Sequence, residues 1–149
     1  SGGAGGGNSL STSIVIPIYN NLAFTKACIE SIFQNTAHGA YELIVVDNGS
    51  TDGSREYLEG LGSRVRCIRN RRNLFFAKGC NRGGWAARGK NLVFLNNDTL
   101  VKTGWLDELL RPLEADEIVG VVGNKQLFPA SHPTCANRQR GSSFIPNRA

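Results

Sequence analysis

Several signatures of common nucleotide and metal enzymes are missing from this 149-residue chain. There is no GxGxxG run and no lysine-containing Walker A loop, which argues against a Rossmann dehydrogenase and a P-loop NTPase. There is also no HExxH, no paired Cys/His spacing and no GxSxG elbow, the patterns of zinc enzymes, zinc modules and α/β-hydrolases. No apolar run approaches the roughly 20 residues that a membrane-spanning helix needs.

Acidic residues are missing from one long stretch of the chain. Between residues 64 and 90 there are nine lysines and arginines and no Asp or Glu, and the formal net charge of the whole chain is +5. Such a patch fits a nucleotide pyrophosphate, an anionic membrane surface or a nucleic acid. It also fits an ordinary solvated surface, so the charge alone does not identify a partner.

Both ends of the chain differ in composition from its middle. Residues 1–11 are rich in glycine and lack the basic and apolar regions of a signal peptide, so we expect a flexible tail or an expression remnant. Residues 130–149 are rich in Pro, Asn, Arg and Ser, and we expect an irregular tail there. Residues 12–129 should form a single domain. The four cysteines have no CxxC spacing, and we expect free thiols in a reducing cytoplasm.

Short apolar runs alternate with amphipathic segments through most of the chain. The runs predict strands at 13–17, 41–46, 64–68, 92–95 and 118–122. The segments between them predict helices at about 22–34, 52–61, 78–88 and 105–113. Strand and helix in alternation predict an α/β fold with a mostly parallel, doubly wound sheet.

Three expectations about packing follow from these patterns. The four apolar residues 92–95 should form a strand that is buried on both faces. In the first helix, Phe24, Cys28 and Ile32 should share the buried face. The predicted helix at 78–88 carries three glycines, each of which costs about 1 kcal/mol relative to alanine. Close approach of that helix to the sheet would explain them.

Polar side chains follow three of the predicted strands. Tyr19 follows the first strand, Asp47 and Asn48 the second, and Asn97 and Asp98 the fourth. A right-handed α/β topology places these strand ends along one edge of the sheet, where ligands bind. An aromatic ring can stack on a base, and a carboxylate beside amide oxygens can hold a hard divalent cation such as Mg²⁺. The same residue types also favour simple turns, so both interpretations stay open on these residues alone.

Four segments carry a resemblance to a known family. They read SIVIPIYN at 13–20, ELIVVDNGSTDGS at 42–54, NLFFAKGCNRG at 73–83 and FLNNDT at 94–99. In this order and spacing the chain resembles the family 2 glycosyltransferases, which have the GT-A fold, over about residues 12–129. The Leu-Asn-Asn-Asp-Thr form is similar to the rhamnosyltransferase-like branch that acts in cell-surface polysaccharide synthesis.

The resemblance implies roles for particular residues. Those matched to nucleotide binding are Pro17, Ile18, Tyr19, Asp47, Asn73, Asn81 and Asn97. The first three match the segment that packs against base and ribose, and Asp47 matches the acidic residue that hydrogen-bonds the base. Asp98 matches the ligand of Mg²⁺ or Mn²⁺, with Asn96 standing where the family's first Asp usually stands. Asn73 and Asn81 match the motif that closes over the donor.

The resemblance also implies a reaction. A sugar would pass, with inversion, from a UDP- or dTDP-sugar donor to a hydroxyl of a saccharide or lipid-linked acceptor, helped by a carboxylate general base. No Asp or Glu follows Glu117, so that base is missing, and the tail after Pro129 departs from the family pattern. We therefore expect only the nucleotide-binding half, as a truncated chain, an altered reading frame or a fragment. Its expected location is the cytoplasm, with peripheral association at the inner face of the membrane left open.

Three other functions remain as alternatives. A non-catalytic module would bind a nucleotide-sugar without making product, and the missing base favours it. A nucleic-acid-binding domain would use the basic stretch together with Phe75 and Phe76. The chain has no RNA-recognition or helix-turn-helix signature, so we expect no nucleic acid partner. A nucleotidyltransferase would need a Gly-rich, Lys-containing loop after the first strand, and this loop is absent.

Overall fold

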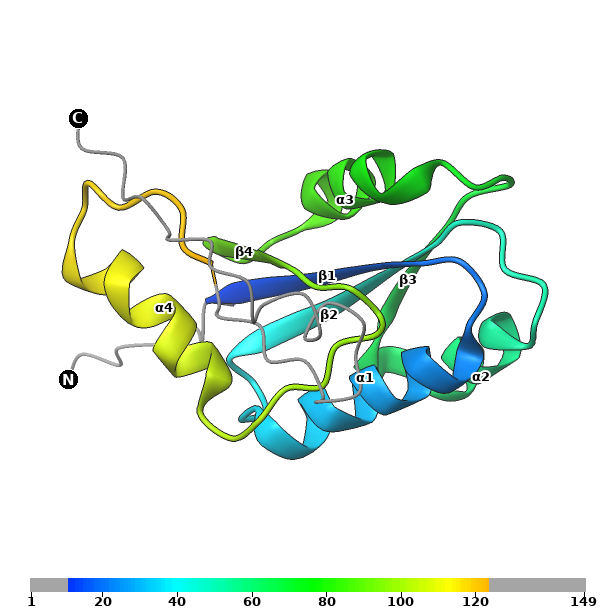
Figure 1. The fold of residues 1–149 in the computed structure, drawn as a ribbon, viewed down its shortest axis with the longest axis horizontal. Coiled ribbons are helices and arrows are strands. Elements are labelled where there is room, and N and C mark those ends of the chain that lie inside the picture. The colour runs from blue at the N-terminus through cyan, green and yellow to red at the C-terminus, as the bar shows by residue number, and fades with distance from the viewer. Residues whose placement is uncertain (1–10, 124–149) are drawn as a thin grey trace, which may run out of the picture. The chain divides into compact units, whose positions relative to one another are not determined.

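The computed structural model describes residues 11–123 of the chain (Figure 1). Contacts divide the chain into two compact units, Ser1–Asp107 and Glu108–Ala149. The elements are β1 (Thr12–Ile18), α1 (Leu22–Asn35), β2 (Tyr41–Asp47), α2 (Ser54–Gly60), a 3₁₀ turn (Gly62–Arg64), β3 (Arg66–Arg69), α3 (Phe75–Ala86), β4 (Asn91–Phe94) and α4 (Trp105–Ala115). The expected tails at 1–10 and 130–149 lie outside the described residues.

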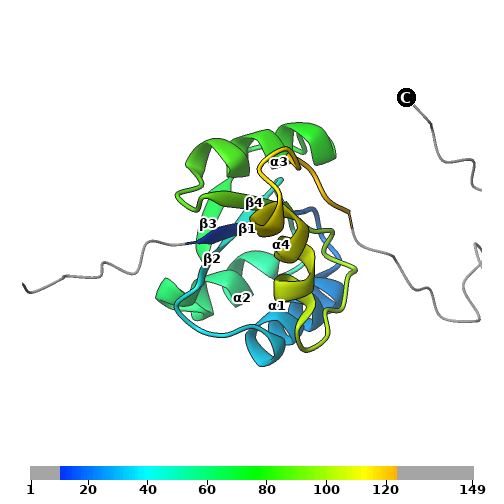
Figure 2. The ribbon, with the colours of Figure 1, turned by 90° about the vertical axis from the view of Figure 1, so that its left-hand side faces the viewer.

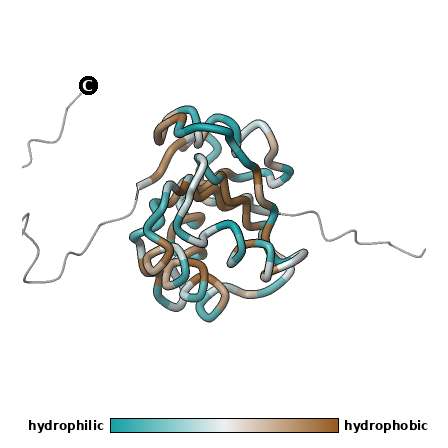
Figure 3. The backbone as a smooth tube through the Cα atoms, turned by 90° about the vertical axis from the view of Figure 1, so that its right-hand side faces the viewer, coloured by the Kyte–Doolittle hydropathy of each residue, from teal (hydrophilic) through white to brown (hydrophobic). Residues whose placement is uncertain are grey.

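The four strands form one parallel sheet in the order β3-β2-β1-β4. The predicted α/β class is therefore confirmed. β1 and β2 occupy the centre, and their apolar residues supply most of the core, as the hydrophobic strands in the middle of Figure 3 show. Ile18 pairs with Asp47 in register, so the two central strands end side by side. Just before β1, Ser11 N donates to Ala40 O (3.2 Å), next to the start of β2.

Helices cover both faces of the sheet. α1 and α2 lie on one face and α3 on the other (Figures 1 and 2). The buried residues of α1 are Thr25, Cys28, Ile29 and Ile32. The expectation that Phe24 would share this face was wrong, since Phe24 is 57% exposed. The buried stripe follows helical spacing from position 25, and residue 24 falls one position outside it.

Two of the three glycines in α3 are explained by close approach to the sheet. A Cβ atom at Gly83 would lie 2.1 Å from Val15 Cγ1, and one at Gly79 would lie 3.0 Å from Pro17 Cβ. At Gly84 a Cβ would make only ordinary contacts, the nearest at 3.7 Å from the ring of Phe94. The expected close packing is thus confirmed for the first two positions.

The prediction for β4 was only half right. Its strand exists, but Leu92 is 47% exposed and Phe94 46% exposed, while Val93 between them is buried. The strand is not buried on both faces, because it is the last strand of the described sheet and one of its faces is only partly covered. The apolar run is continuous in sequence, but burial alternates along it from Leu92 to Phe94.

The predicted fifth strand at 118–122 does not form. Ile118 and Val121 are 92% and 90% exposed. The side chain of Asp116 accepts a hydrogen bond from Ile118 N (2.9 Å), and its carbonyl accepts one from Val119 N (3.1 Å). A local turn therefore takes the N–H groups that a strand would need. Across the described helices of residues 11–123, none has the length and apolar character to cross a membrane.

Candidate functional site

The loops that follow β1 and β2 are joined by hydrogen bonds between side chains and backbone. Asn20 N donates to Ser50 Oγ (2.8 Å), and Thr51 N donates to Asn20 Oδ1 (2.8 Å). Leu22 N, at the start of α1, donates to Asp52 Oδ2 (2.8 Å). Asn20 has a φ of 54°, in the left-handed region that asparagine tolerates better than most residues. The carboxyl ends of the two central strands are therefore held as one unit.

Asp52 is the residue in this region whose role sequence reasoning missed. We expected it to begin the helix that follows it. One of its oxygens instead accepts the hydrogen bond from Leu22 N at the start of α1, 30 residues away in sequence. Its other oxygen accepts Ser54 Oγ (2.6 Å) and Ser54 N (3.2 Å). Burial alone would raise the pKa of Asp52, but the hydrogen bonds from Ser54 and Leu22 outweigh it and lower that pKa. A negative charge is thereby kept at the positive end of α1.

The residues matched to base and ribose binding differ in how far they are accessible. Tyr19 is 47% exposed, whereas Pro17 is buried and Ile18 is 1% exposed. Asp47 is 3% exposed, and its Oδ1 accepts Ser50 N (2.9 Å). The structure brings these residues to one sheet edge, and Tyr19 is the side chain among them that a ligand reaches most readily.

The polar residues after β4 form a turn at the same edge of the sheet. Thr99 N donates to Asn96 O (3.2 Å), and Asn97 Nδ2 donates to Thr25 Oγ1 (3.2 Å) on α1. Asn97 is thus oriented by a buried hydroxyl, with its amide oxygen left as an acceptor. Asp98 is exposed and has no hydrogen bond or ion pair within residues 11–123. It presents an uncommitted carboxylate.

A divalent metal fits this turn only as part of a shared site. Within residues 11–123 there is no group of three or more His, Cys, Asp and Glu side chains that could hold a metal ion. Mg²⁺, however, usually keeps several waters and binds one or two carboxylates together with substrate phosphates. Asp98, with the amide oxygens beside it, suits that arrangement. The donor set therefore fits a metal held jointly with a diphosphate.

One cysteine, Cys28, lies close to the turn after β4. Cys28, Cys67 and Cys80 are free thiols, as expected, and Cys135 lies outside the described residues. Burial raises the pKa of Cys28 to about 12, and the negative charge of Asp98 contributes to the rise. A buried thiol with a raised pKa is a poor nucleophile.

Asn73 and Asn81 lie apart from each other. Asn73 Oδ1 accepts Phe75 N (2.8 Å) where α3 begins. Phe75 has a φ of 61° and is 76% exposed. Asn81 is exposed on α3 and lines a shallow pocket of about 270 Å³, together with Cys80, Gly84, Trp85, Leu92 and Phe94. The structure therefore gives Asn73 a local role at the helix start and places Asn81 toward β4.

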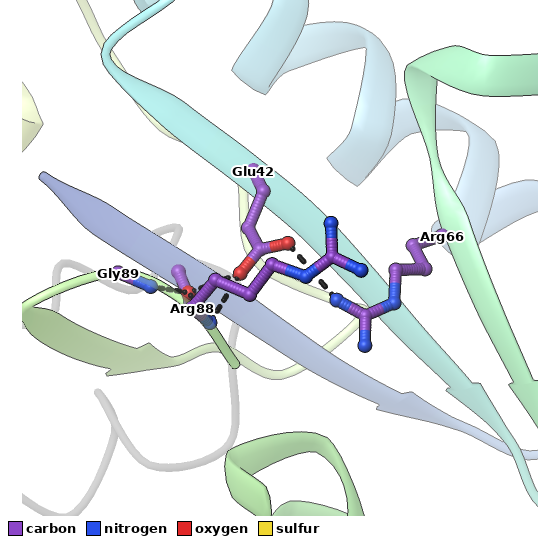
Figure 4. Close-up of polar contacts among 5 residues, drawn as sticks. Glu42, Arg66, Arg88 and Gly89 are labelled. Carbon is purple, nitrogen blue, oxygen red and sulfur yellow. Dashed lines mark hydrogen bonds and ion pairs between the residues drawn. The ribbon is translucent and has the colours of Figure 1, made fainter. Parts of the chain in front are cut away.

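A second polar cluster lies at the opposite end of the strands (Figure 4). Glu42 Oε1 accepts Ser13 Oγ and Arg88 N, both at 2.6 Å, and Glu42 Oε2 pairs with Arg66 at 3.2 Å. Gly89 N donates to Ser13 Oγ (2.8 Å). Burial would raise the pKa of Glu42, but the hydrogen bonds from Ser13 and Arg88 and the charge of Arg66 lower it overall. Both oxygens of this carboxylate are occupied by partners from the chain itself.

Comparison with known proteins assigns the family. The model of the family described as Glycosyl transferase family 2 matches residues 13–147. The chain belongs to glycosyl transferase family 2. The match includes the four sequence segments that carry the resemblance and continues beyond Pro129, where we expected the family pattern to end.

Two curated relatives illustrate the similarity. Glycosyltransferase GlyG of Streptococcus pneumoniae is 30% identical over 115 residues, covering 75% of this chain and 38% of the relative. An uncharacterized glycosyltransferase of Haemophilus influenzae is 29% identical over 115 residues, covering 75% of this chain and 35% of the relative. The chain thus spans little more than a third of the length of either protein.

Solved structures show the same GT-A fold. S. aureus TarS 1-349 in complex with UDP-GlcNAc superposes with a TM-score of 0.66 at 19% identity, covering 78% of this chain and 37% of that one. The mannosyltransferase PcManGT of Pyrobaculum calidifontis, in complex with GDP-Man and Mn²⁺, gives a TM-score of 0.56 at 20% identity. It covers 60% of this chain and 28% of that one. At these identities the likeness establishes the fold.

Proposed function

We propose that this chain is the donor-binding half of a metal-dependent, inverting glycosyltransferase. It would bind a UDP- or dTDP-sugar, whose sugar passes to a saccharide or lipid-linked acceptor in cell-surface polysaccharide synthesis in the cytoplasm. The observation that carries this proposal is the exposed, uncommitted carboxylate of Asp98 in the turn after β4, at the same sheet edge as Tyr19 and Asp47. Membership of glycosyl transferase family 2 supports it.

Each residue of the site would do a distinct job. The exposed ring of Tyr19 would stack on the base, and the carboxylate of Asp47 would accept a hydrogen bond from it. The free amide oxygen of Asn97 would meet the ribose or a metal-bound water. Asp98 would hold Mg²⁺ or Mn²⁺ with the donor's diphosphate. When bound, the metal would offset the charge that develops on the leaving diphosphate.

The ligands named for the structural neighbours are consistent with this assignment. TarS was solved with UDP-GlcNAc and with UDP, and PcManGT with GDP-Man and Mn²⁺. Nucleotide-diphosphate sugars therefore occur with this fold, and in one case a divalent metal occurs as well. By analogy we assign the same class of donor to the edge formed by β1, β2 and β4.

No residue of this chain is proposed as the general base. The carboxylates at the donor edge are Asp47, which is buried, Asp52, which caps α1, and Asp98, assigned to the metal. No Asp or Glu follows Glu117. We therefore expect the 149-residue chain to bind the donor without transferring the sugar at full rate.

The test is calorimetric titration of the chain with UDP and with dTDP, with and without Mn²⁺. Metal-dependent binding is expected. It should weaken about 10-fold to 100-fold in Asp98→Ala, the range for loss of a charged contact. Asp107→Ala is the matched control, because Asp107 is exposed on α4 and loses the same charge. The assignment of the metal to Asp98 would be overturned if Mn²⁺ did not change the binding affinity, or if Asp98→Ala and Asp107→Ala weakened binding equally.

A second candidate is a non-catalytic nucleotide-sugar-binding module, favoured by the same lack of a base. Both candidates predict donor binding. An added acceptor-side polypeptide should restore sugar transfer if the chain is half of an enzyme, and should not restore it if the chain is a non-catalytic module. Sugar transfer can be followed by mass spectrometry of acceptor saccharides incubated with UDP-GlcNAc. Full-rate transfer by this chain alone would contradict the absence of a base and exclude the non-catalytic module.

A further inference from the structure

The outer face of α3 carries a tryptophan that is almost fully exposed. α3 lies on the face of the sheet opposite α1 and α2 (Figures 1 and 2). It buries Gly79, Cys80 and Gly83, whereas Trp85 is 90% exposed. Lys78, two helical turns before Trp85 and on the same stripe of the helix, is exposed as well. Packing within residues 11–123 does not account for a ring in this position, so the ring is available to a partner.

Two more aromatic rings are exposed at the amino end of the same helix. Phe75 is 76% exposed and Phe76 is 52% exposed. α3 thus has three exposed aromatic rings among its 12 residues, whereas α1, with 14 residues, has one, Phe24. From Phe75 to Trp85 the helix extends about 15 Å. Rings spread over that length suit an extended surface, and tryptophan favours the boundary between water and lipid.

The charged groups around these rings are positive. Arg71, Arg72 and Arg82 line a pocket beside the donor edge. The other exposed cations between residues 71 and 90 are Lys78, Arg88 and Lys90. Residues 11–123 supply no ion pair for any of these six, and residues 64–90 include no Asp or Glu. The α3 face therefore has a positive potential that attracts an anionic surface.

The opposite face of the sheet has the reverse balance of charge. α1 and α2 together contain three glutamates and two cations, which gives a formal charge of −1. α3 contains two cations and no acidic residue, which gives +2. An anionic surface would therefore attract the α3 face more strongly than the face formed by α1 and α2. This asymmetry determines which side of the chain would lie against such a surface.

We propose that the outer face of α3 docks on an anionic membrane surface. Trp85 enters the head-group region, and Lys78, Arg88 and Lys90 contact lipid phosphates. Aromatic rings combined with basic side chains bind anionic bilayers because apolar contact and charge attraction add to each other. Neither Asp98 nor the metal takes part, so this docking is independent of the proposed function.

Nucleic acid fits this face less well than a bilayer does. Single-stranded nucleic acid also attracts aromatic and basic side chains, but proteins bind it in a groove that follows its backbone. A helix that lies on top of a sheet presents a convex face. A convex face with rings at both ends suits the plane of a bilayer, into which the rings insert.

The test is cosedimentation of the whole chain with vesicles of phosphatidylglycerol in phosphatidylcholine. Binding is expected to these vesicles and not to pure phosphatidylcholine, and it should weaken as salt is raised. Lys78→Gln should weaken it about fivefold, the contribution of one basic residue near the surface. Trp85→Ala should weaken it at least as much. Phe24→Ala and Lys26→Gln are the matched controls, because they remove an exposed ring and an exposed cation from α1 on the opposite face, and they should change binding less than twofold.

Tryptophan fluorescence tests the orientation of the bound chain. The chain has two tryptophans, and Trp105 is only 9% exposed, with its Nε1 donating to Thr36 Oγ1 (2.9 Å). Trp85 is therefore the residue whose emission should shift to the blue on anionic vesicles and be quenched by brominated lipid chains. Trp85→Phe keeps an aromatic ring, so it should still cosediment but lose this spectral change.

Several results would overturn the docking of α3. They are failure to cosediment, equal binding to pure phosphatidylcholine, equal weakening by the α1 variants, and a bound chain whose Trp85 emission does not change. Binding to a single-stranded oligonucleotide in place of vesicles, lost in Trp85→Ala, would assign the face to nucleic acid instead. Asp98→Ala should cosediment as the unchanged chain does, so failure of the donor site and failure of the α3 face are distinguishable.

Discussion

The two ends of the parallel sheet differ in whether their charged side chains are paired within the chain. At the amino end, Glu42 has both oxygens occupied by Ser13, Arg88 and Arg66, and its charge is balanced within the chain. At the carboxyl end, Asp98 has no partner within residues 11–123. Arg82 there is oriented only by the neutral amide of Asn70.

Charges that are paired within the chain stabilise the fold, whereas charges without a partner can bind a ligand. A partly buried carboxylate with its hydrogen bonds complete contributes to stability and has no capacity left for binding. An exposed charge without a partner contributes little to stability and keeps its full attraction for a ligand. We therefore propose that the amino end of the sheet is structural and that its carboxyl end binds the ligand. The helix α3 runs between the two ends.

The largest expected effect comes from disturbing α3, on which both ends depend. Gly83→Ala would place a Cβ atom 2.1 Å from Val15 Cγ1, and we expect it to destabilise the fold by about 3 kcal/mol. Urea unfolding followed by circular dichroism measures the change. Gly84→Ala is the control, because its Cβ has room and alanine favours a helix by up to about 1 kcal/mol. Equal destabilisation by both variants would contradict the close packing of α3 against β1 at Gly83.

A smaller effect should be confined to the amino end. Glu42→Gln removes the negative charge that pairs with Arg66 and that strengthens the hydrogen bond from Arg88 N. We expect the free energy of unfolding to fall by about 2 kcal/mol. Nucleotide binding at 25 °C should stay within twofold of the unchanged chain. Asp98→Asn removes a charge at the other end, and its effect on stability should stay within about 0.5 kcal/mol. If Asp98→Asn proved the more destabilising of the two, the division between the ends would fail.

The contribution of Glu42 should depend on pH. Its folded-state pKa is lowered from the ordinary 4.5, so its stabilisation is present above that value and is lost as the pH falls through the folded-state pKa. The difference in unfolding free energy between the unchanged chain and Glu42→Gln should be largest at pH 6 and shrink below pH 4.5. Asp52, whose pKa is also lowered, is present in both proteins and cancels from the difference. A difference that is constant from pH 6 to pH 3 would speak against this assignment.

The smallest effect concerns the backbone at the start of α3. Phe75 has a φ of 61°, which glycine adopts more readily than any residue with a Cβ atom. The variant with glycine at position 75 should therefore be more stable than the variant with alanine there by about 1 kcal/mol. At the adjacent Phe76, within the helix, the order should reverse. Thermal unfolding of the four variants measures both differences, and the same order at both positions would exclude a left-handed conformation at Phe75.

The sequence was sufficient for the central strands and for the edge where their polar residues meet. The apolar runs of β1 and β2 stop before Tyr19 and Asp47, and in the structure β1 ends at Ile18 and β2 ends at Asp47. Burial on each face was harder to predict, because it depends on neighbours. Leu92 and Phe94 look like core residues until the strand order leaves β4 at the side of the described sheet.

The contacts that shape the site could not be predicted from local patterns. Asp52 resembles a cap for the helix that follows it, and its bond to Leu22 becomes visible only when β1 and β2 are paired. The bonds from Asn70 to Asn48 and from Arg82 to Asn70 likewise join segments that are distant in sequence. The position of Asp98 at this sheet edge was predictable, because a carboxylate shortly after an apolar run is a local signal.

The hydrogen bonds between the loops after β1 and β2 have a consequence for the thermodynamics of ligand binding. Asn20, Ser50 and Asp52 fix those loops during folding, before any ligand arrives. A ligand that docks on them then loses little conformational entropy from the protein, whose ordering cost has already been met. Its association should be fast and nearly rigid-body, with a heat-capacity change that reflects the surface it covers and no coupled loop folding.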